Sequence, residues 1–257
     1  MIKKRIIFAL LYSRGSFYLS RNFRLQKVGD IDWLEKNYNF HKTCEYVDEL
    51  AFILVTRDPD QSEINNFFKN VNKVRKKVFS PVILGGGIRK ITDVKTYFDN
   101  GADKILINSK IFDKDLINNI SEIYGNQAIS IMIDYKIENG NLNLYLNCGR
   151  EKQDINMNEI LKKLKNINYG EIIFHSMDRD GTGNGYDLEI LKKLSNLPNK
   201  PILLMGGAGK PEHLLEALKL NQISGVITAN LFNFIGDGLK KTREVILNKN
   251  INIAKLN

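Results

Sequence analysis

Two glycine turns, about half the chain apart, are the residues of this sequence best suited to bind an anion. Gly85-Gly86-Gly87 follows one apolar run and Gly206-Gly207-Ala208-Gly209 follows another, and each turn leads into a helix-like segment and a second apolar run. Because glycine lets backbone N–H groups approach an anion closely, the repeat favours two phosphate sites over bare turn geometry. A small molecule with a phosphate at each end would fit both. The predicted phosphate-binding residues are Gly86, Gly87, Asn108 and Ser109 in one site and Gly207, Ala208, Gly209, Ala229 and Asn230 in the other.

Carboxylates and a histidine near the ends of apolar runs are the candidates for proton transfer. Asp134 ends the run that begins at Ala128, and Asp180 lies in the motif 176–182, just after His175. Asp134 can act as a general base and Asp180 can bind or orient a ligand, but a short carboxylate can also brace its loop through backbone hydrogen bonds. Both interpretations stay open for Asp134 and Asp180, our catalytic candidates. His175 has two options as well, proton transfer or a hydrogen-bonded packing role.

The sequence shows no spacing typical of metal ligands. Cys44 and Cys148 are the only cysteines, and neither has a metal-ligand partner nearby in sequence, so we expect both to be reduced. His41 and His213 lie in helix-like segments, where we expect them at the surface or behind the site. We therefore expect neither a metal nor another cofactor.

The elements that would position these residues alternate between strands and helices. Continuous apolar runs separated by amphipathic segments indicate a parallel sheet, and eight strands in this length indicate a (β/α)8 TIM barrel. An alternating stretch, 141–148, follows Asn139-Gly140 and predicts a β-hairpin in the fifth strand–helix loop. The predicted strands are 6–12, 50–55, 82–84, 105–108, 128–134, 172–175, 202–205 and 225–229, and helices are predicted at 59–78, 91–100, 113–124, 157–166, 187–194 and 211–220.

Length and composition place further bounds on the protein. A chain of 257 residues with 43% hydrophobic residues suits one domain, and no linker divides it. We expect one barrel, 1–257, built from half-barrels of about 1–125 and 126–257 that each carry a glycine turn. The net charge of +9 comes from lysines scattered among asparagines, so nucleic acid is not an expected partner. No signal peptide or 18-residue apolar run is present, which predicts a cytoplasmic protein that does not bind a membrane.

Several motifs together resemble the cyclase subunit of imidazole glycerol phosphate synthase over nearly the whole chain. The most specific is Ser176-Met-Asp-Arg-Asp-Gly-Thr, and others are Lys4-Arg-Ile-Ile, Gly85-Gly-Gly-Ile-Arg and Gly206-Gly-Ala-Gly-Lys-Pro-Glu-His. In that family a separate glutaminase subunit supplies ammonia through the barrel axis. The cyclase, a lyase, uses the ammonia to cleave and cyclise a bis-phosphorylated intermediate of histidine biosynthesis. The resemblance implies that the two glycine turns hold that substrate's phosphates.

The catalytic positions implied by the resemblance are only partly kept. Asp134 matches the family's fifth-strand aspartate, but the first-strand aspartate falls on Leu11. A general acid/base pair needs two titratable groups, and leucine cannot carry a proton. Three further polar positions of the family are apolar in this sequence. They would lie with Leu11 at the carboxyl ends of the barrel strands, which we call the mouth, and they change the ligands that the mouth favours. They fall on Leu19, Leu54 and Met205. We therefore expect the usual cyclase reaction to be weak or absent.

The amino ends of the strands keep the family pattern better. Two cations and two anions around a narrow axis can form a closed ring of ion pairs, although charged residues also commonly flank barrel strands for solubility. The resemblance implies that four such residues gate the ammonia channel and that two more face the glutaminase. The gate residues fall on Arg5, Glu49, Lys104 and Glu171, and the docking residues on Asp103 and Gln127.

The gate residues at the amino ends of the strands match the family, whereas the catalytic positions at the mouth do not. This combination predicts a subunit that relays ammonia without cyclising a substrate. The chain is similar to paralogues of the cyclase in bacterial surface-polysaccharide pathways, where a separate sugar amidotransferase makes an acetamidino sugar. The leading hypothesis is a subunit that forms a heterodimer with a glutaminase and delivers ammonia to such an acceptor. Two alternatives stay open: the ordinary cyclase of histidine biosynthesis, and a non-catalytic scaffold for a glutaminase and an amidotransferase.

Overall fold

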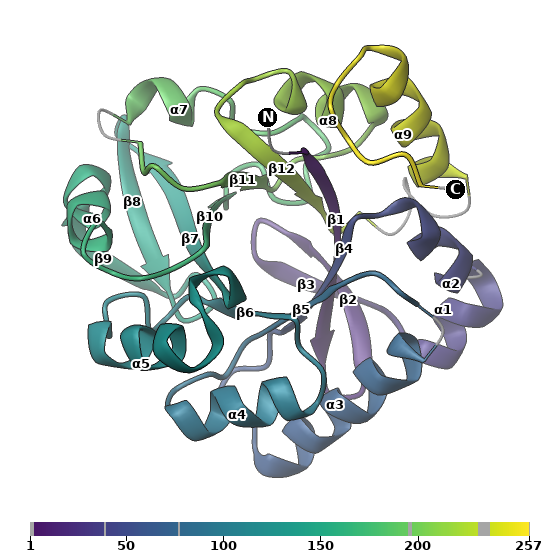
Figure 1. Ribbon diagram of the computed structural model, residues 1–257, viewed down its shortest axis with the longest axis horizontal. Coiled ribbons are helices and arrows are strands. Elements are labelled where there is room, and N and C mark those ends of the chain that lie inside the picture. Colours follow the sequence, from purple (N-terminus) through teal and green to yellow (C-terminus); the bar gives the residue numbers. More distant parts are fainter. Residues whose placement is uncertain (1–2, 39, 77, 195–196, 231–236, 257) are drawn as a thin grey trace.

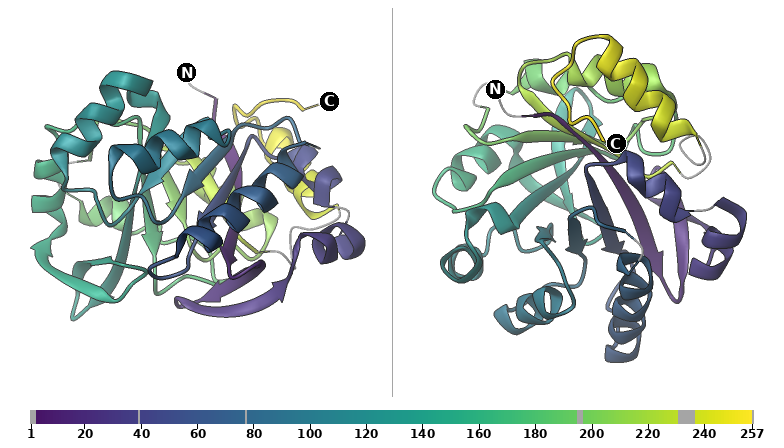
Figure 2. Two further views of the ribbon diagram at one scale, coloured as in Figure 1. Left: turned by 90° about the horizontal axis from the view of Figure 1, so that it is seen from below. Right: turned by 45° about the vertical axis from the view of Figure 1, so that its right-hand side comes forward.

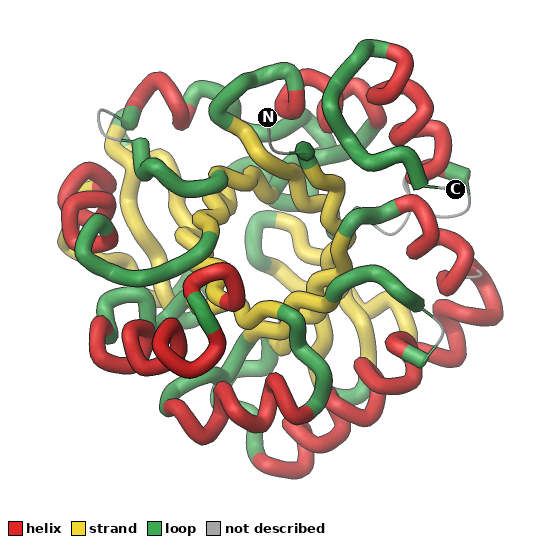
Figure 3. The backbone as a smooth tube through the Cα atoms, viewed as in Figure 1, coloured by secondary structure: helices red, strands yellow, loops and turns green. Residues whose placement is uncertain are grey.

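Eight parallel strands of the computed structural model form a closed barrel, within the residues that the structure describes: 3–38, 40–76, 78–194, 197–230 and 237–256. The barrel strands are β1 (Arg5–Ser13), β4 (Glu49–Leu54), β5 (Val82–Gly85), β6 (Lys104–Ile107), β7 (Ile129–Glu138), β10 (Glu171–Ser176), β11 (Ile202–Met205) and β12 (Ile223–Thr228). Their order is β10-β11-β12-β1-β4-β5-β6-β7, and pairing of β7 with β10 closes the ring (Figures 1 and 3). The predicted (β/α)8 barrel is confirmed.

Alternating side chains give the barrel two separate cores. On β1, Ile6 and Phe8 pack outward into the layer shared with the helices, whereas Ile7 and Ala9 point into the lumen. Because successive side chains of a strand point to opposite faces, both faces of a barrel strand are buried, and its sequence reads as a continuous apolar run. The buried lumen cluster is Ile7, Ala9, Ala51, Ile83, Leu106, Met132, Ile173, Leu203, Met205 and Ile227.

The helices begin where side chains can cap them. Asp60, Asp113 and Asn156 each accept a hydrogen bond from the backbone N–H three residues later, which satisfies a donor of the first turn. The predicted helix 187–194 is much shorter, because the Asp187 carboxylate accepts from Tyr135 instead of capping a helix. No helix in the described part of the chain could cross a membrane. The helices are α1 (Ile31–Tyr38), α2 (Phe40–Thr43), α3 (Gln61–Arg75), α4 (Ile91–Asp99), α5 (Lys114–Tyr124), α6 (Met157–Leu164), α7 (Ile190–Lys193), α8 (Pro211–Leu218) and α9 (Gly238–Asn248), with 3-10 turns at Cys44–Tyr46 and Asn126–Ala128.

Two β-hairpins extend from the carboxyl ends of the barrel strands, at the end opposite the start of β1 (Figure 2). The first was predicted: β8 (Asn141–Leu146) pairs with the end of β7, and β9 (Glu151–Asn156) adds a further strand. The second was not predicted and consists of β2 (Ser16–Arg21) and β3 (Arg24–Gly29). Asn22 and Phe23 form its turn with φ values of 49° and 63°, as a tight two-residue turn requires.

Candidate functional site

Two cavities lie side by side at the carboxyl ends of the barrel strands. One has a volume of about 940 Å³ and the other about 850 Å³, and Ser20, Leu25 and Met205 line both. The β2–β3 hairpin, which carries Ser20 and Leu25, therefore forms part of the wall between them. This end of a (β/α)8 barrel is where its strand–helix loops can assemble a site.

Each cavity contains one of the two glycine turns. Gly86 and Gly87 line the smaller cavity, and Gly207 and Ala208 line the larger one. Two strands separate β5–β6 from β11–β12 in either direction around the ring, so the turns lie on opposite sides of the barrel. This is the arrangement expected from two similar half-barrels.

Backbone geometry explains why these turns need glycine. Gly86 and Gly207 have φ values of 95° and 103°, and a Cβ on either would come within 2.0 Å or 2.1 Å of a backbone carbonyl oxygen. Gly87 differs, because its φ is 70° but the nearest atom to an added Cβ is 3.4 Å away. Bare turn geometry therefore accounts for Gly86 and Gly207, while Gly87 leaves room beside its backbone.

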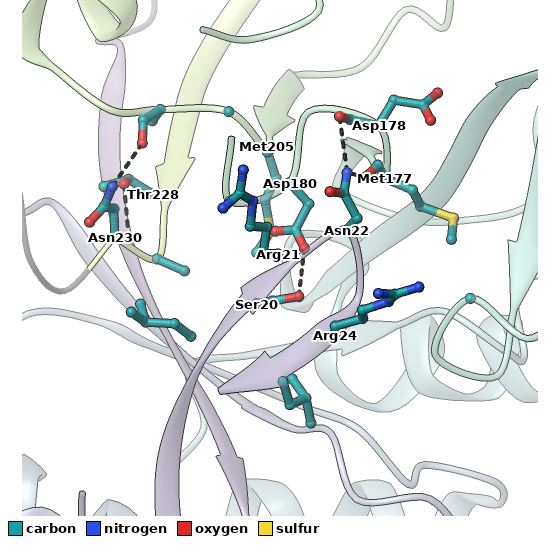
Figure 4. A pocket seen from close by; sticks show the side chains of 18 of the residues that line it. Ser20, Arg21, Asn22, Arg24, Met177, Asp178, Asp180, Met205, Thr228 and Asn230 are labelled. Atoms are coloured by element: carbon teal, nitrogen blue, oxygen red, sulfur yellow. Dashed lines mark hydrogen bonds between the residues drawn. The ribbon is translucent and has the colours of Figure 1, made fainter. Parts of the chain in front are cut away.

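Two of the other predicted phosphate-binding residues, Asn108 and Asn230, are held by hydrogen bonds. Asn108 donates through Nδ2 to the Met132 carbonyl and to Asp134 Oδ2, both at 3.1 Å. Asn230 donates to Ala208 O at 3.5 Å (Figure 4). Ser109 lines the smaller cavity, and Ala229 and Asn230 line the larger one. Gly209 stands apart, because its N–H donates to His213 Nδ1 at 3.1 Å and it lines neither cavity.

Three titratable side chains form a buried array between the cavities. Nδ1 of His175 lies 2.9 Å from Oδ1 of Asp134, and its Nε2 lies 3.8 Å from Oδ1 of Asp180. The second distance is an ion-pair distance, and Nε2 has no hydrogen-bond partner in the described structure. All three side chains are buried. The two catalytic candidates thus lie on opposite sides of one imidazole, an arrangement that the separate motifs did not predict.

The array is charged because of its contacts. Burial by itself would lower the pKa of His175, but its hydrogen bond to Asp134 and the nearby Asp180 carboxylate outweigh burial and raise the pKa to about 9. Burial would likewise raise the pKa of Asp180, yet His175, Ser20 and the Phe23 N–H hold it below its usual value. An imidazolium between two carboxylates is therefore the expected state at neutral pH.

Asp180 also fixes the β2–β3 hairpin. Its Oδ2 accepts hydrogen bonds from Ser20 Oγ at 2.5 Å (Figure 4) and from the Phe23 N–H at 3.1 Å. The Phe23 ring lies against His175 with centroids 4.9 Å apart, and Asn22 Nδ2 donates to the Met177 carbonyl at 3.1 Å. The Asp180 carboxylate thus braces the β2–β3 hairpin rather than its own loop. Ser20 and Phe23 were missed from the sequence, where only the alternating pattern of 16–20 and the asparagine at the turn hint at a hairpin.

Three strand ends in the mouth carry apolar side chains. Leu11, Leu54 and Met205 are buried at the carboxyl ends of β1, β4 and β11, and each lines a cavity. Met205 is the register partner of His175 across β10 and β11. The structure therefore places no proton donor or acceptor at residue 11, on the strand where the resemblance puts the partner of Asp134.

A closed ring of ion pairs lies at the opposite end of the barrel. Arg5 donates to Glu49 and to Glu171, each at 2.6 Å, while Lys104 Nζ lies 2.9 Å from Glu49 and 3.4 Å from Glu171. Each of the four is the first residue of its strand. Ser130 Oγ adds a 2.5 Å hydrogen bond to Glu171. Burial would raise the pKa of Glu171, but Arg5 and Lys104 lower it below its usual value.

The lumen between the ring and the mouth is lined by apolar side chains. On β10 the inward residues are Glu171 in the ring, Ile173 in the lumen and His175 in the mouth. The same order on β7 is Ser130, Met132 and Asp134. Charged layers thus close both ends of an apolar core.

The surface around the ring, at the amino ends of the barrel strands, carries exposed polar and apolar residues; we call it the ring face. Asp103 and Gln127 are exposed and precede β6 and β7, at the same end as the ring. Phe79, in the connection between α3 and β5, is fully exposed at this end. No group of three or more histidine, cysteine or acidic side chains among the described residues could hold a metal.

Comparisons with known proteins agree in one family. The family model described as "Histidine biosynthesis protein" matches residues 36–236. The chain is 41% identical over 245 residues to a protein of Parasynechococcus marenigrum (strain WH8102) provisionally named imidazole glycerol phosphate synthase subunit hisF2, with 95% of this chain and 90% of the relative covered. It is 35% identical over 257 residues to imidazole glycerol phosphate synthase subunit HisF of Lachnoclostridium phytofermentans, covering 98% and 97%. The same subunit of Flavobacterium psychrophilum is 34% identical over 256 residues, covering 98% and 99%.

Proposed function

The chain belongs to the histidine biosynthesis protein family as a relative of HisF, and from this premise we propose that it is the ammonia-conducting subunit of a glutaminase complex. In this proposal a glutaminase binds at the ring face, and ammonia crosses the barrel and leaves at the mouth. The acceptor is a sugar amidotransferase of surface-polysaccharide biosynthesis.

The ring supports an entrance that can be closed. Each of the four ring residues pairs with two others, so the displacement of one side chain leaves each of the other three charges with a partner. A buried charge without a partner would cost several kcal/mol, about 3–5 in comparable cases. Such a ring can open locally at lower cost than an isolated ion pair.

The lumen supports transfer of neutral ammonia. Its buried aliphatic side chains would disfavour ammonium and water much more than NH₃, because the cost of burying an unpaired charge far exceeds that of a small neutral molecule. Ammonia that crosses such a core would reach the mouth unprotonated and still nucleophilic.

One observation favours ammonia conduction over the cyclase reaction: the acid/base pair that cyclisation needs is incomplete. Leu11 has no titratable group, and the Asp134 carboxylate is already hydrogen-bonded to His175 Nδ1 and to Asn108. Cyclisation requires a proton to be donated on one side of the substrate and removed on the other. Delivery of ammonia to a second enzyme requires neither step in this mouth.

Reconstitution tests the proposal. The glutaminase should hydrolyse glutamine faster with this chain than alone. With amide-¹⁵N glutamine and excess unlabelled ammonium, the amidinated sugar should retain ¹⁵N, because conducted ammonia does not mix with the bulk. A glutaminase that neither binds nor responds to the chain would overturn the proposal, and complete dilution of the label would overturn conduction.

One observation favours the ordinary cyclase as a second candidate. Two glycine turns lie in two cavities on opposite sides of the barrel, as a substrate with two terminal phosphates would need. Incubation with ammonia and the bis-phosphorylated intermediate decides between the two. Measurable product would mean that Asp134 and Asp180 suffice for turnover.

A non-catalytic scaffold is the third candidate. A scaffold and a conduit differ in their response to changes within the ring. Lys104→Met should lower ¹⁵N retention in a conduit but leave product formation and labelling unchanged in a scaffold. Lys95→Met, on the exposed surface of α4, is the matched control.

A further inference from the structure

Arginine and lysine are distributed very differently over this chain. The sequence contains ten arginines among its 38 basic residues, and the other 28 are lysines. Six of the ten arginines line the two mouth cavities, whereas among the described lysines only Lys110 and Lys136 do so. The six, which we call the arginine rim, are Arg14, Arg21, Arg24, Arg57, Arg89 and Arg150.

The arginine rim is contributed by separate loops at one end of the barrel. Arg21 and Arg24 flank the turn of the β2–β3 hairpin, and the other four follow β1, β4, β5 and β8. All six are exposed. Only Arg89 has an ion pair with a described residue, at 2.6 Å from Asp58. Five of the six rim arginines thus make no ion pair with a described residue.

Three of the four other arginines have internal roles, and the fourth, Arg179, donates to Asn184 O within its own loop at 3.4 Å. Arg5 belongs to the ring, Arg243 is buried against Asp48 at 2.7 Å, and Arg75 donates to Asn100 O. Lysine is otherwise the basic residue of this surface. A guanidinium can bind a carboxylate through two parallel hydrogen bonds, and arginine is enriched at protein interfaces while lysine is depleted. The change from lysine to arginine therefore marks a binding surface.

Two features favour a protein over a small molecule as the occupant. The guanidinium groups lie on exposed loops around the cavities, and Leu25, which lines both cavities, is 43% exposed among them. An exposed apolar side chain surrounded by arginines is the composition of an interface centre with a charged edge.

The hairpin that carries part of the rim is also fixed before any partner binds. Ser20 Oγ and the Phe23 N–H hold it to Asp180. Arg21 and Arg24 lie on either side of the Ser20–Asp180 contact (Figure 4). A surface that is already ordered loses less conformational entropy on binding.

We propose that the arginine rim docks an acidic surface of the amidotransferase that accepts the ammonia. This rests on the function proposed above, since it names the surface through which the mouth would be sealed against solvent. Carboxylates of the partner would pair with the guanidinium groups, and Leu25 would fill an apolar pocket between them. The covered mouth would keep ammonia from being protonated in bulk water before it reaches the acceptor.

Charge reversal tests this interface. We would measure binding of the purified amidotransferase to the intact chain with its glutaminase, for the wild type, Arg21→Glu/Arg24→Glu and Arg57→Glu/Arg150→Glu. Each double variant should weaken binding by more than about tenfold, because attraction becomes repulsion at two sites. The control, Lys69→Glu/Lys95→Glu, makes the same charge change on exposed helix surfaces and should stay within about twofold of the wild type.

The outcomes separate this inference from the proposed function. If the wild type activates the glutaminase but the amidotransferase binds neither it nor the variants, or binds all of them equally, the docking surface is wrong and the glutaminase complex stands. If the glutaminase does not respond, the proposed function fails first. Titration with inorganic pyrophosphate completes the test: binding that the arginine variants lose, without amidotransferase binding, would assign the rim to a small polyanion and overturn the proposal.

Discussion

Asp134 and His175 are register partners on the adjacent strands β7 and β10, and their side chains are joined by a 2.9 Å contact between Oδ1 and Nδ1. Because both residues point into the barrel at the same level, the contact follows directly from the strand register. A carboxylate that could have acted on a substrate is instead the partner of a buried imidazole. Ligand chemistry in this mouth would begin from an ion pair.

The first prediction is that stability falls between about pH 6.5 and pH 9 because His175 loses its proton. Its pKa is raised from 6.5 to about 9, so the folded protein holds the proton more tightly than the unfolded chain does. This contribution is fully present below pH 6.5 and is lost as pH rises through about 9. A shift of this size corresponds to about 3 kcal/mol in the free energy of unfolding. Urea denaturation at pH 6 and pH 9.5 measures it.

His175→Gln provides the control for this pH dependence, because glutamine does not titrate. Its free energy of unfolding should change much less than that of the wild type over the same interval. NMR titration of the imidazole gives the pKa directly. A value at or below 6.5 would mean that the Asp134 and Asp180 contacts do not outweigh burial.

The fold could be predicted from the sequence far more completely than the site. Continuous apolar runs such as 202–205 and the glycine turns follow local rules, because a strand buried on both faces must be apolar throughout. The β2–β3 hairpin was missed, since its outer strand, Arg24–Gly29, is exposed and carries no periodic apolar signal. Local sequence patterns indicate which residues are buried, and few residues of this strand are even partly buried.

The Asp134–His175–Asp180 array was missed for a different reason. Each residue was singled out, but their meeting depends on the pairing of β7 with β10 and on the path of the loop that brings back Asp180. Neither is encoded within a short window of sequence. The ring residues were easier to group, because Arg5, Glu49, Lys104 and Glu171 each begin a strand, and the starts of parallel strands meet at one end of a barrel.

The second prediction concerns the ring. Glu171→Gln should destabilise the fold by about 3 kcal/mol, because Arg5 and Lys104 would then share only Glu49 in a buried layer. The pKa of Glu171 is lowered in the fold, so its contribution is present above the unfolded pKa and is lost as pH falls through the folded value. The variant's deficit should therefore shrink in acid. Glu122→Gln, an exposed change on α5, should have no such effect in urea denaturation.

The third prediction separates phosphate binding from turn geometry. Gly87→Ala adds a methyl group beside the smaller cavity, at a φ of 70° with its nearest neighbour 3.4 Å away. Gly15→Ala places the same group at a φ of 77° with no atom within 4 Å, outside either cavity. Both should lose about 1 kcal/mol of stability to the left-handed backbone. Only Gly87→Ala should weaken binding of inorganic phosphate in calorimetry, and equal phosphate affinity in the two variants would leave Gly87 with a turn role alone.

The fourth prediction places an apolar anchor on the ring face. Phe79 is fully exposed, so Phe79→Ser removes no packing and should change the free energy of unfolding by less than about 0.5 kcal/mol. A glutaminase bound at this face would bury the Phe79 side chain, and loss of an aromatic anchor typically costs more than about tenfold in affinity. Leu25→Ser removes an exposed side chain at the opposite end of the barrel and should leave glutaminase affinity unchanged. Surface plasmon resonance with immobilised glutaminase compares the three proteins. If Leu25→Ser weakens binding and Phe79→Ser does not, the glutaminase docks at the mouth, and the direction of ammonia transfer proposed here is reversed.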